Sequence, residues 1–162
     1  MALRQIRTYG DEILAKKCRV IENVTPRIKE LAQDMLDTMY EANGVGLAAP
    51  QVGVLKRLVV IDVTSDEEEA NPIIMINPEI LESDGEQTGD EGCLSVPGKV
   101  GTVTRPMHVV AKAFDLDMRE YRIEAEGLLA RAICHEIDHL EGRVYVEIAE
   151  GGIRDMEAPD GE

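Results

Sequence analysis

Two histidines four residues apart, His135 and His139, constrain this chain more than any other feature of its sequence. They lie in an apolar segment bracketed by Gly127 and Gly142, which predicts a helix. Positions i and i+4 share one helix face, so both imidazoles can reach one metal ion. Glu136, beside the first histidine, is placed to hold a water molecule at that ion, which indicates metal-assisted hydrolysis with Glu136 as general base. The alternative is a solvent-facing helix, although the chain has only 3 histidines in all.

A catalytic ion usually has a third protein ligand, and three residues are candidates by type. His108, the remaining histidine, lies in a predicted strand, where we expect a packed or surface role. Cys134 is about 100° around the helix from His135, off the ligand face, and is expected to pack in the core. Cys93 follows a glycine-rich turn and precedes a strand, so its thiolate and nearby backbone N–H groups could point into a cleft. A buried, inert cysteine is the alternative for Cys93.

The segment over residues 44–51 combines two glycines and two alanines with a terminal glutamine, Gln51. Such a segment permits close approach of a ligand to the backbone, and Gln51 offers a neutral amide donor. It is not a dinucleotide-binding fingerprint, because it follows a helix and lacks the third glycine. A loop that serves only packing is the alternative.

Taken together, three segments in this order resemble the signature motifs of peptide deformylases. They are Gly44-Val45-Gly46-Leu47-Ala48-Ala49-Pro50-Gln51, Glu91-Gly92-Cys93-Leu94-Ser95 and His135-Glu136-Ile137-Asp138-His139. The resemblance extends from near the N-terminus to about Glu147. It implies hydrolysis of the formyl group from the N-terminal formylmethionine of newly synthesised proteins, with release of formate. It also implies an α+β fold in which antiparallel sheets pack around a central helix that carries the H-E-x-x-H motif.

The same resemblance implies a role for each residue of the second and third motifs that carries chemistry. Cys93, His135 and His139 would be the metal ligands, and Glu136 the general base. The usual physiological metal of the family is Fe²⁺, although Zn²⁺, Ni²⁺ or Co²⁺ can occupy its site. One thiolate with two imidazoles does not by itself select among these ions.

The resemblance also implies how the substrate is held. Gln51 and the backbone N–H of Leu94 would donate to the oxyanion. Main-chain groups of the first motif would bind the backbone of the formyl peptide, and an apolar pocket suits the unbranched methionine side chain. The candidates are Gly44, Val45 and Gly46 for the backbone contacts, and Val45, Leu128 and Ala132 for the pocket.

Five positions depart from the familiar pattern of the family. Asn43 is often acidic there, Cys134 is often glutamine, and Arg131 stands where an apolar pocket residue is frequent. Val100 and Gly101 stand where a larger or charged residue often follows the second motif. None of the five belongs to the catalytic set, but they leave open the shape of the pocket and the peptide contacts beyond methionine.

The remaining pattern predicts one α+β catalytic domain over residues 1–148 and an acidic, disordered tail over residues 149–162. Runs of strands interrupted by two separate helices favour α+β over a regular βαβ alternation. The first helix begins at Thr25-Pro26 and ends before Asn43-Gly44. The other expected features are a helical turn near 11–17, an irregular segment over 44–53, and strands over 58–63, 73–81, 99–115 and 144–148.

Charge and cysteine usage bear on the partners of the chain. With 17 basic and 32 acidic residues, its formal net charge is −15. This charge argues against broad electrostatic binding to nucleic acid or an anionic membrane, so we expect only weak or transient contact with the ribosome. There is no signal-peptide or membrane-spanning run, and the three separated cysteines make a poor disulfide framework. We therefore expect a cytoplasmic monomer that acts on nascent formyl-Met polypeptides.

Two other functions remain open from the sequence. A metallopeptidase of the H-E-x-x-H type takes a third histidine or a downstream glutamate as ligand, and Glu157 has a suitable separation. A non-catalytic module that kept the fold would have lost Glu136, Gln51 or a ligand, and all are present. Cys93 separates the peptidase from the deformylase, because replacing Cys93 by alanine should remove the metal only from the deformylase.

Overall fold

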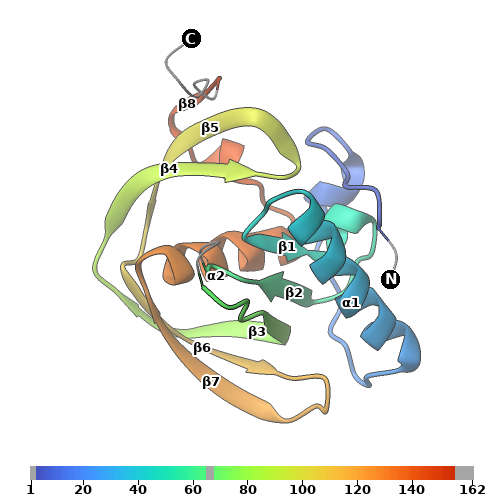
Figure 1. The fold of residues 1–162 in the computed structure, drawn as a ribbon. Coiled ribbons are helices and arrows are strands. Elements are labelled where there is room, and N and C mark those ends of the chain that lie inside the picture. The colour runs from blue at the N-terminus through green and yellow to red at the C-terminus, as the bar shows by residue number, and fades with distance from the viewer. Residues whose placement is uncertain (1–2, 65–67, 156–162) are drawn as a thin grey trace.

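The computed structural model describes residues 3–64 and 68–155 of the 162-residue chain. Two antiparallel sheets lie on either side of the central helix α2 (Gly127–Leu140), as Figure 1 shows. This is the α+β architecture expected from the sequence. Within the described residues, no helix is long and apolar enough to cross a lipid bilayer.

The larger sheet has five strands, and α2 packs against one of its faces. Every pair of neighbours in it is antiparallel. In spatial order the strands are β1 (Gly46–Ala48), β2 (Leu58–Ile61), β3 (Ile73–Asp84), β6 (His108–Phe114) and β7 (Glu120–Glu126). All four residues of β2 are buried, because its two faces pack against α1 and α2.

The smaller sheet has three strands and lies on the other side of α2. Its strands are β4 (Gln87–Cys93), β5 (Val96–Arg105) and β8 (Glu150–Asp155), in that spatial order. The β4–β5 hairpin turns at Leu94 and Ser95, next to Cys93. The hairpin therefore brings the end of β4 to the helix that carries the histidines.

Helix α1 (Pro26–Glu41) begins where the sequence predicts. The Thr25 hydroxyl accepts a hydrogen bond from the Ile28 backbone N–H, and Pro26 occupies the first turn, where its missing N–H costs nothing. The buried face of α1 includes Leu31, Met35 and Met39, which pack against β1 and β2.

Three short 3₁₀ helices complete the described part of the chain: η1 (Glu12–Ala15), η2 (Ala49–Val52) and η3 (Tyr145–Glu147). The first lies within the helical turn predicted near residues 11–17. The segment over 44–53, expected to be irregular, contains β1 and η2. The strand predicted over 144–148 is wrong, since this apolar run forms η3 and buries Tyr145.

Further corrections concern the strands. The single strand predicted over 99–115 is two, β5 and β6, because the chain breaks pairing at Pro106, which has no N–H to donate. Strands β4 and β7 were not predicted. Strand β4 has almost no apolar residues, whereas β7 alternates Tyr121, Ile123 and Ala125 with charged residues, a strand pattern that the sequence prediction missed.

The disordered tail predicted from residue 149 is wrong for Glu150–Asp155. These residues form β8, which pairs with β5, although every one of them is exposed. Gly101 of β5 permits this packing, because a Cβ there would lie 2.7 Å from the Cβ of Ala149. Residues 156–162, the rest of the predicted tail, lie outside the described residues.

Candidate metal centre and active site

Cys93, His135 and His139 form a cluster of possible metal ligands. One donor atom from each lies within 4.8 Å of the others. The Cys93 Sγ atom is 3.3 Å from Nε2 of His139, and the two imidazole rings meet edge to face with centroids 5.0 Å apart. A thiolate and two imidazoles are a donor set that suits Fe²⁺, Zn²⁺ and neighbouring transition metals. In the part of the chain that the structure describes, no other such cluster is found.

The two histidines differ in electrostatic environment. Burial holds the pKa of His139 well below its usual value, so this ring stays neutral, as a metal ligand must be. Burial also acts to lower the pKa of His135, but the carboxylate of Glu136 and the contacts with Cys93 and Glu91 outweigh it and raise that pKa. His135 thus lies next to the carboxylates of Glu136 and Glu91 and the sulfur of Cys93.

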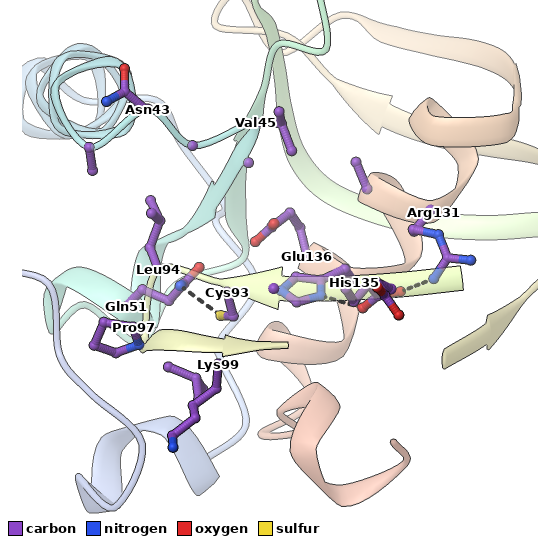
Figure 2. A pocket seen from close by; sticks show the side chains of 18 of the residues that line it. Asn43, Val45, Gln51, Cys93, Leu94, Pro97, Lys99, Arg131, His135 and Glu136 are labelled. Atoms are coloured by element: carbon purple, nitrogen blue, oxygen red, sulfur yellow. Dashed lines mark hydrogen bonds and ion pairs between the residues drawn. The ribbon is translucent and has the colours of Figure 1, made fainter. Parts of the chain in front are cut away.

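Glu136 projects from α2 beside this cluster (Figure 2). Its side chain is 4% exposed, and its Oε1 atom has no hydrogen-bond partner among the described residues. Burial is the main reason that the pKa of Glu136 is raised, to about 7. A buried, unpartnered carboxylate oxygen is costly unless it meets another polar group, so its place beside the donor cluster fits a metal site.

Gly46 of β1 makes room for the Glu136 carboxylate. A Cβ at this position would overlap the carboxylate, whereas the hydrogen of glycine does not. The backbone of β1 therefore passes close to the Glu136 carboxylate. The backbone also comes close to a side chain at Gly44, because a Cβ there would lie 2.6 Å from a methyl group of Leu94.

Gln51 is held in one orientation on the other side of the cluster. Its Oε1 accepts a hydrogen bond from the Ala48 backbone N–H at 2.9 Å. Its Nε2 therefore faces the opposite way, donating to the Ser95 hydroxyl at 3.0 Å and lying 3.5 Å from the Cys93 Sγ atom. The amide group is 1% exposed and directs its donors toward the site (Figure 2).

A second layer of charged side chains supports His135. The Glu91 carboxylate accepts from His135 Nδ1 at 2.7 Å, from Arg105 at 2.8 and 2.9 Å, and from Arg131 at 2.7 Å. Arg105 also donates to Asp138 at 2.7 Å. Burial would raise the pKa of Glu91, but the hydrogen bonds from Arg105 and His135 outweigh it and hold that pKa far below its usual value.

The sequence patterns predicted no role for Glu91, Arg105 or Ser95, and Arg131 was noted only as a departure from the family pattern. Two signals in the sequence point to these contacts. Glu91 is two residues before Cys93, so strand alternation puts both side chains on one face. Arg131 is four residues before His135, on the same face of the helix. Neither signal reveals that the two meet, because β4 and α2 are far apart in the chain.

A pocket of about 400 Å³ opens beside the cluster. It contains the five substrate-binding candidates, which are Gly44, Val45, Gly46, Leu128 and Ala132. Val45 and Leu128 are 44% and 53% exposed, whereas Ala132 is buried. Leu94 and Lys99 also line the pocket, so its lining combines apolar and charged side chains.

Other candidate residues lie elsewhere. His108 of β6 contacts Asp84 at 3.0 Å and Glu124 at 2.5 Å, outside the cluster. Cys134 packs against the apolar core, and burial raises the pKa of its thiol to about 11. Both agree with the roles expected of them. Glu157, the possible third ligand of a peptidase, lies outside the described residues.

Comparison with known proteins gives one consistent result. A family model for polypeptide deformylases matches residues 3–152 of this chain. A peptide deformylase of Agathobacter rectalis is 64% identical over 160 residues, which are 99% of this chain and 98% of that protein.

Solved structures agree with the sequence matches. The crystal structure of a peptide deformylase from Legionella pneumophila matches with a TM-score of 0.87 and 46% identity, covering 92% of this chain and 87% of that one. The crystal structure of the peptide deformylase from Thermotoga maritima also has a TM-score of 0.87, at 35% identity, covering 93% of this chain and 99% of that one.

Proposed function

The chain belongs to the polypeptide deformylase family, and we propose that Cys93, His135 and His139 bind its catalytic metal ion. It is a metal-dependent hydrolase that removes the formyl group from the N-terminal formylmethionine of newly synthesised proteins. The observation that carries the assignment of the site is the convergence of the three donor atoms beside the buried, unpartnered Oε1 of Glu136.

The ion that we propose is Fe²⁺, with Zn²⁺, Ni²⁺ or Co²⁺ as possible substitutes. The thiolate of Cys93 and the imidazoles of His135 and His139 would hold it. When bound, it supplies a Lewis acid that polarises the formyl oxygen and lowers the pKa of the attacking water. Three protein ligands are the number usual in catalytic metal sites, which would leave room for water or substrate.

Glu136 is the proton carrier of the reaction. Its carboxylate takes a proton from the attacking water and returns it to the amine nitrogen as the C–N bond breaks. Formate and a free methionine amino group are the products. The unpartnered Oε1 atom supports this role, since it can accept a hydrogen bond from water without breaking one inside the protein.

Gln51 and the backbone N–H of Leu94 stabilise the oxyanion. Ala48 holds the oxygen of the Gln51 amide, so the nitrogen end is directed at the site before substrate binds. A preorganised donor of this kind is worth about 10²–10³ in rate. Leu94 supplies its N–H from the turn that follows Cys93.

The formylmethionine side chain binds in the pocket of about 400 Å³ beside the cluster. Val45, Leu128 and Ala132 give the apolar surface that contacts the methionine thioether. The backbone at Gly44 and Val45, and at Gly46 where β1 begins, aligns the peptide. The enzyme works in the cytoplasm as a monomer and meets nascent chains with weak, transient ribosome contact.

A formate-release assay tests the assignment. Protein purified without oxygen and supplied with Fe²⁺ should release formate from a formyl-Met peptide and leave an internal peptide bond intact. Cys93→Ala and His139→Ala should abolish both metal binding and formate release, whereas Cys134→Ala, which changes a cysteine outside the cluster, should keep both. Internal cleavage without formate release, or a metal content unchanged in Cys93→Ala, contradicts the proposal.

A further inference from the structure

Arg131 is a buried cation on the helix that carries the histidines, and none of the proposed steps of the reaction uses it. Its side chain is 9% exposed, although arginine is rarely buried without a specific partner. Since Arg131, His135 and His139 are spaced by four residues, they follow one face of α2 over successive turns. Arg131 and His135 both line the pocket, and Figure 2 shows them on the same helix.

The guanidinium of Arg131 joins α2 to both strands of the β4–β5 hairpin. It donates to the Glu91 carboxylate at 2.7 Å, to the carbonyl oxygen of Val103 at 3.1 Å and to that of Gln87 at 3.4 Å. The planar, forked geometry of arginine suits several acceptors at once, which a single ammonium group cannot match. Arg131 thus fixes the position of the Glu91 carboxylate relative to α2.

Glu91 in turn holds the ligand histidine. Its Oε1 is 2.7 Å from Nδ1 of His135, and its Oε2 is 2.7 Å from Arg131. An acceptor on one ring nitrogen sets the tautomer and the orientation of a metal-binding imidazole, and so directs the other nitrogen at the metal. Arg105 reaches the same carboxylate from β5, so Glu91 is held from two directions.

We propose that Arg131 is a positioning residue of the metal centre, which acts through Glu91 to hold the His135 imidazole in its metal-binding orientation. The proposal rests on the ligand set assigned above. Among the described residues, loss of Arg131 leaves Arg105 as the only arginine on the Glu91 carboxylate and removes one of the two contacts from the helix that carries His135. His135 should then be held less firmly, and the metal should leave more readily.

The test uses the protein loaded with Co²⁺, whose visible absorption reports its coordination. Arg131→Met should lose Co²⁺ to a chelator about 10-fold or more faster than the wild type, as is usual when a residue behind a metal ligand is removed. Its Co²⁺ absorption bands should also shift. Arg131→Lys, which keeps the charge but not the fork, should fall between the two.

A matched control separates positioning from general stability. Arg57→Met removes the 2.6 Å ion pair between Arg57 and Glu141, which also ties the end of α2 to the sheet but does not reach Glu91. This variant should lower the melting temperature and keep the wild-type absorption bands and rate of Co²⁺ loss. The comparison is made well below the melting temperature of every variant.

A double-mutant cycle tests whether Arg131 acts through Glu91. In a Glu91→Gln background, Arg131→Met should accelerate Co²⁺ loss much less than it does in the wild type, because the two residues share one pathway. An equal acceleration in both backgrounds contradicts the proposed route.

The proposal is overturned if Arg131→Met shows the absorption bands and the Co²⁺ retention of the wild type. If Arg131→Met does not fold, the same wild-type result in Arg131→Lys overturns it. The ligand assignment is judged separately: it fails if His139→Ala binds Co²⁺ as the wild type does.

Discussion

At the scale of single residues, the site depends on two kinds of close fit. Glu136 lies buried with one carboxylate oxygen unpartnered, and Gly46 leaves the space that this carboxylate fills. Gln51 is oriented by a backbone N–H before any ligand arrives. The protein thus holds these polar groups in fixed orientations, whereas water molecules would have to reorient. Preorganised groups of this kind can strongly stabilise the charge of a transition state.

Glu136→Gln should retain the metal and lose formate release by about 10²–10⁴-fold, the usual contribution of a general acid–base group. The amide keeps the size of the side chain but cannot carry the proton. Metal content and turnover of a formyl-Met peptide are to be measured on the same sample. A loss smaller than tenfold would reject Glu136 as the principal proton carrier.

Gly46→Ala should reduce turnover strongly while the protein still folds. The added methyl group overlaps the Glu136 carboxylate, so this side chain must move from its position beside the donor cluster. Gly89→Ala is the control for an added methyl group, because a Cβ there would lie at an ordinary 3.5 Å from the Arg131 guanidinium, and the metal content of this variant checks that Arg131 is undisturbed. Equal activity in the two variants would show that Glu136 tolerates displacement.

At the scale of elements, the two sheets use side chains differently. Strands β1 and β2 are fully buried, whereas β8 is fully exposed and is held by backbone pairing and by ion pairs such as Arg154–Asp90. His108 links three strands, because it lies on β6 between Asp84 of β3 and Glu124 of β7. Exposed contacts of this kind should influence stability modestly and in a pH-dependent way.

His108 should stabilise the fold at mildly acidic pH and contribute less as the pH rises. The hydrogen bond to Glu124 is the main reason that the pKa of His108 is raised above 6.5 in the folded protein. A raised pKa means stabilisation that is fully present below the unfolded value and is lost as the pH rises through the folded value. Urea unfolding of wild type and His108→Gln should therefore differ more at pH 6 than at pH 9. A difference that grows with pH would contradict this.

Removing residues 150–162 should leave activity on a short formyl-Met peptide within about twofold and lower the melting temperature by about 2–4 °C, the shift expected for ~1 kcal/mol in a chain of this size. Ala149, which packs against Gly101, is retained. The deleted strand has only exposed residues, and surface ion pairs contribute about 0–1 kcal/mol each. A tenfold loss of turnover would show that β8 positions the β4–β5 hairpin.

At the scale of the whole molecule, the site is where three parts of the chain meet. Helix α2 gives the histidines and Glu136, the β4–β5 hairpin gives Cys93, and β1 with η2 gives Gly46 and Gln51.

The net charge is also a property of the whole molecule. A net charge of −15 repels anionic RNA over roughly a Debye length, about 8–10 Å in ordinary salt.

Empty ribosomes should therefore retain little of this protein at physiological salt. Capture of nascent chains would depend mainly on the formyl-Met pocket, since phosphate contacts need clustered lysine and arginine. Co-sedimentation with empty ribosomes measures this, with the variant that lacks residues 150–162 as a comparison. Tight binding that the deletion abolishes would show that the C-terminal segment docks despite its acidic charge.

Local patterns predicted the elements that have strong local causes. The Thr25-Pro26 start of α1, the span of α2 and the positions of β2 and β3 follow from capping, periodicity and apolar runs. Strand β4 could not be found in this way, because hydrogen bonding to β5, rather than apolar side chains, holds it extended. Strand β7 was missed although Tyr121, Ile123 and Ala125 alternate along it and pack against the core. The run over 144–148 has an apolar strand pattern, yet burying Tyr145 in η3 satisfies it as well.

The sequence by itself determined the chemical parts of the site: a histidine pair on one helix face, a glutamate between them, and a cysteine and a glutamine in glycine-rich segments. The spacing along one helix fixes such a pair locally, so no knowledge of the fold is needed to see it. Only the tertiary structure decided that Arg131 and Arg105 converge on Glu91, and that Glu91 accepts from His135. These residues come from α2, β5 and β4, and contacts between distant segments depend on how the sheets pack around the helix, which local patterns do not encode.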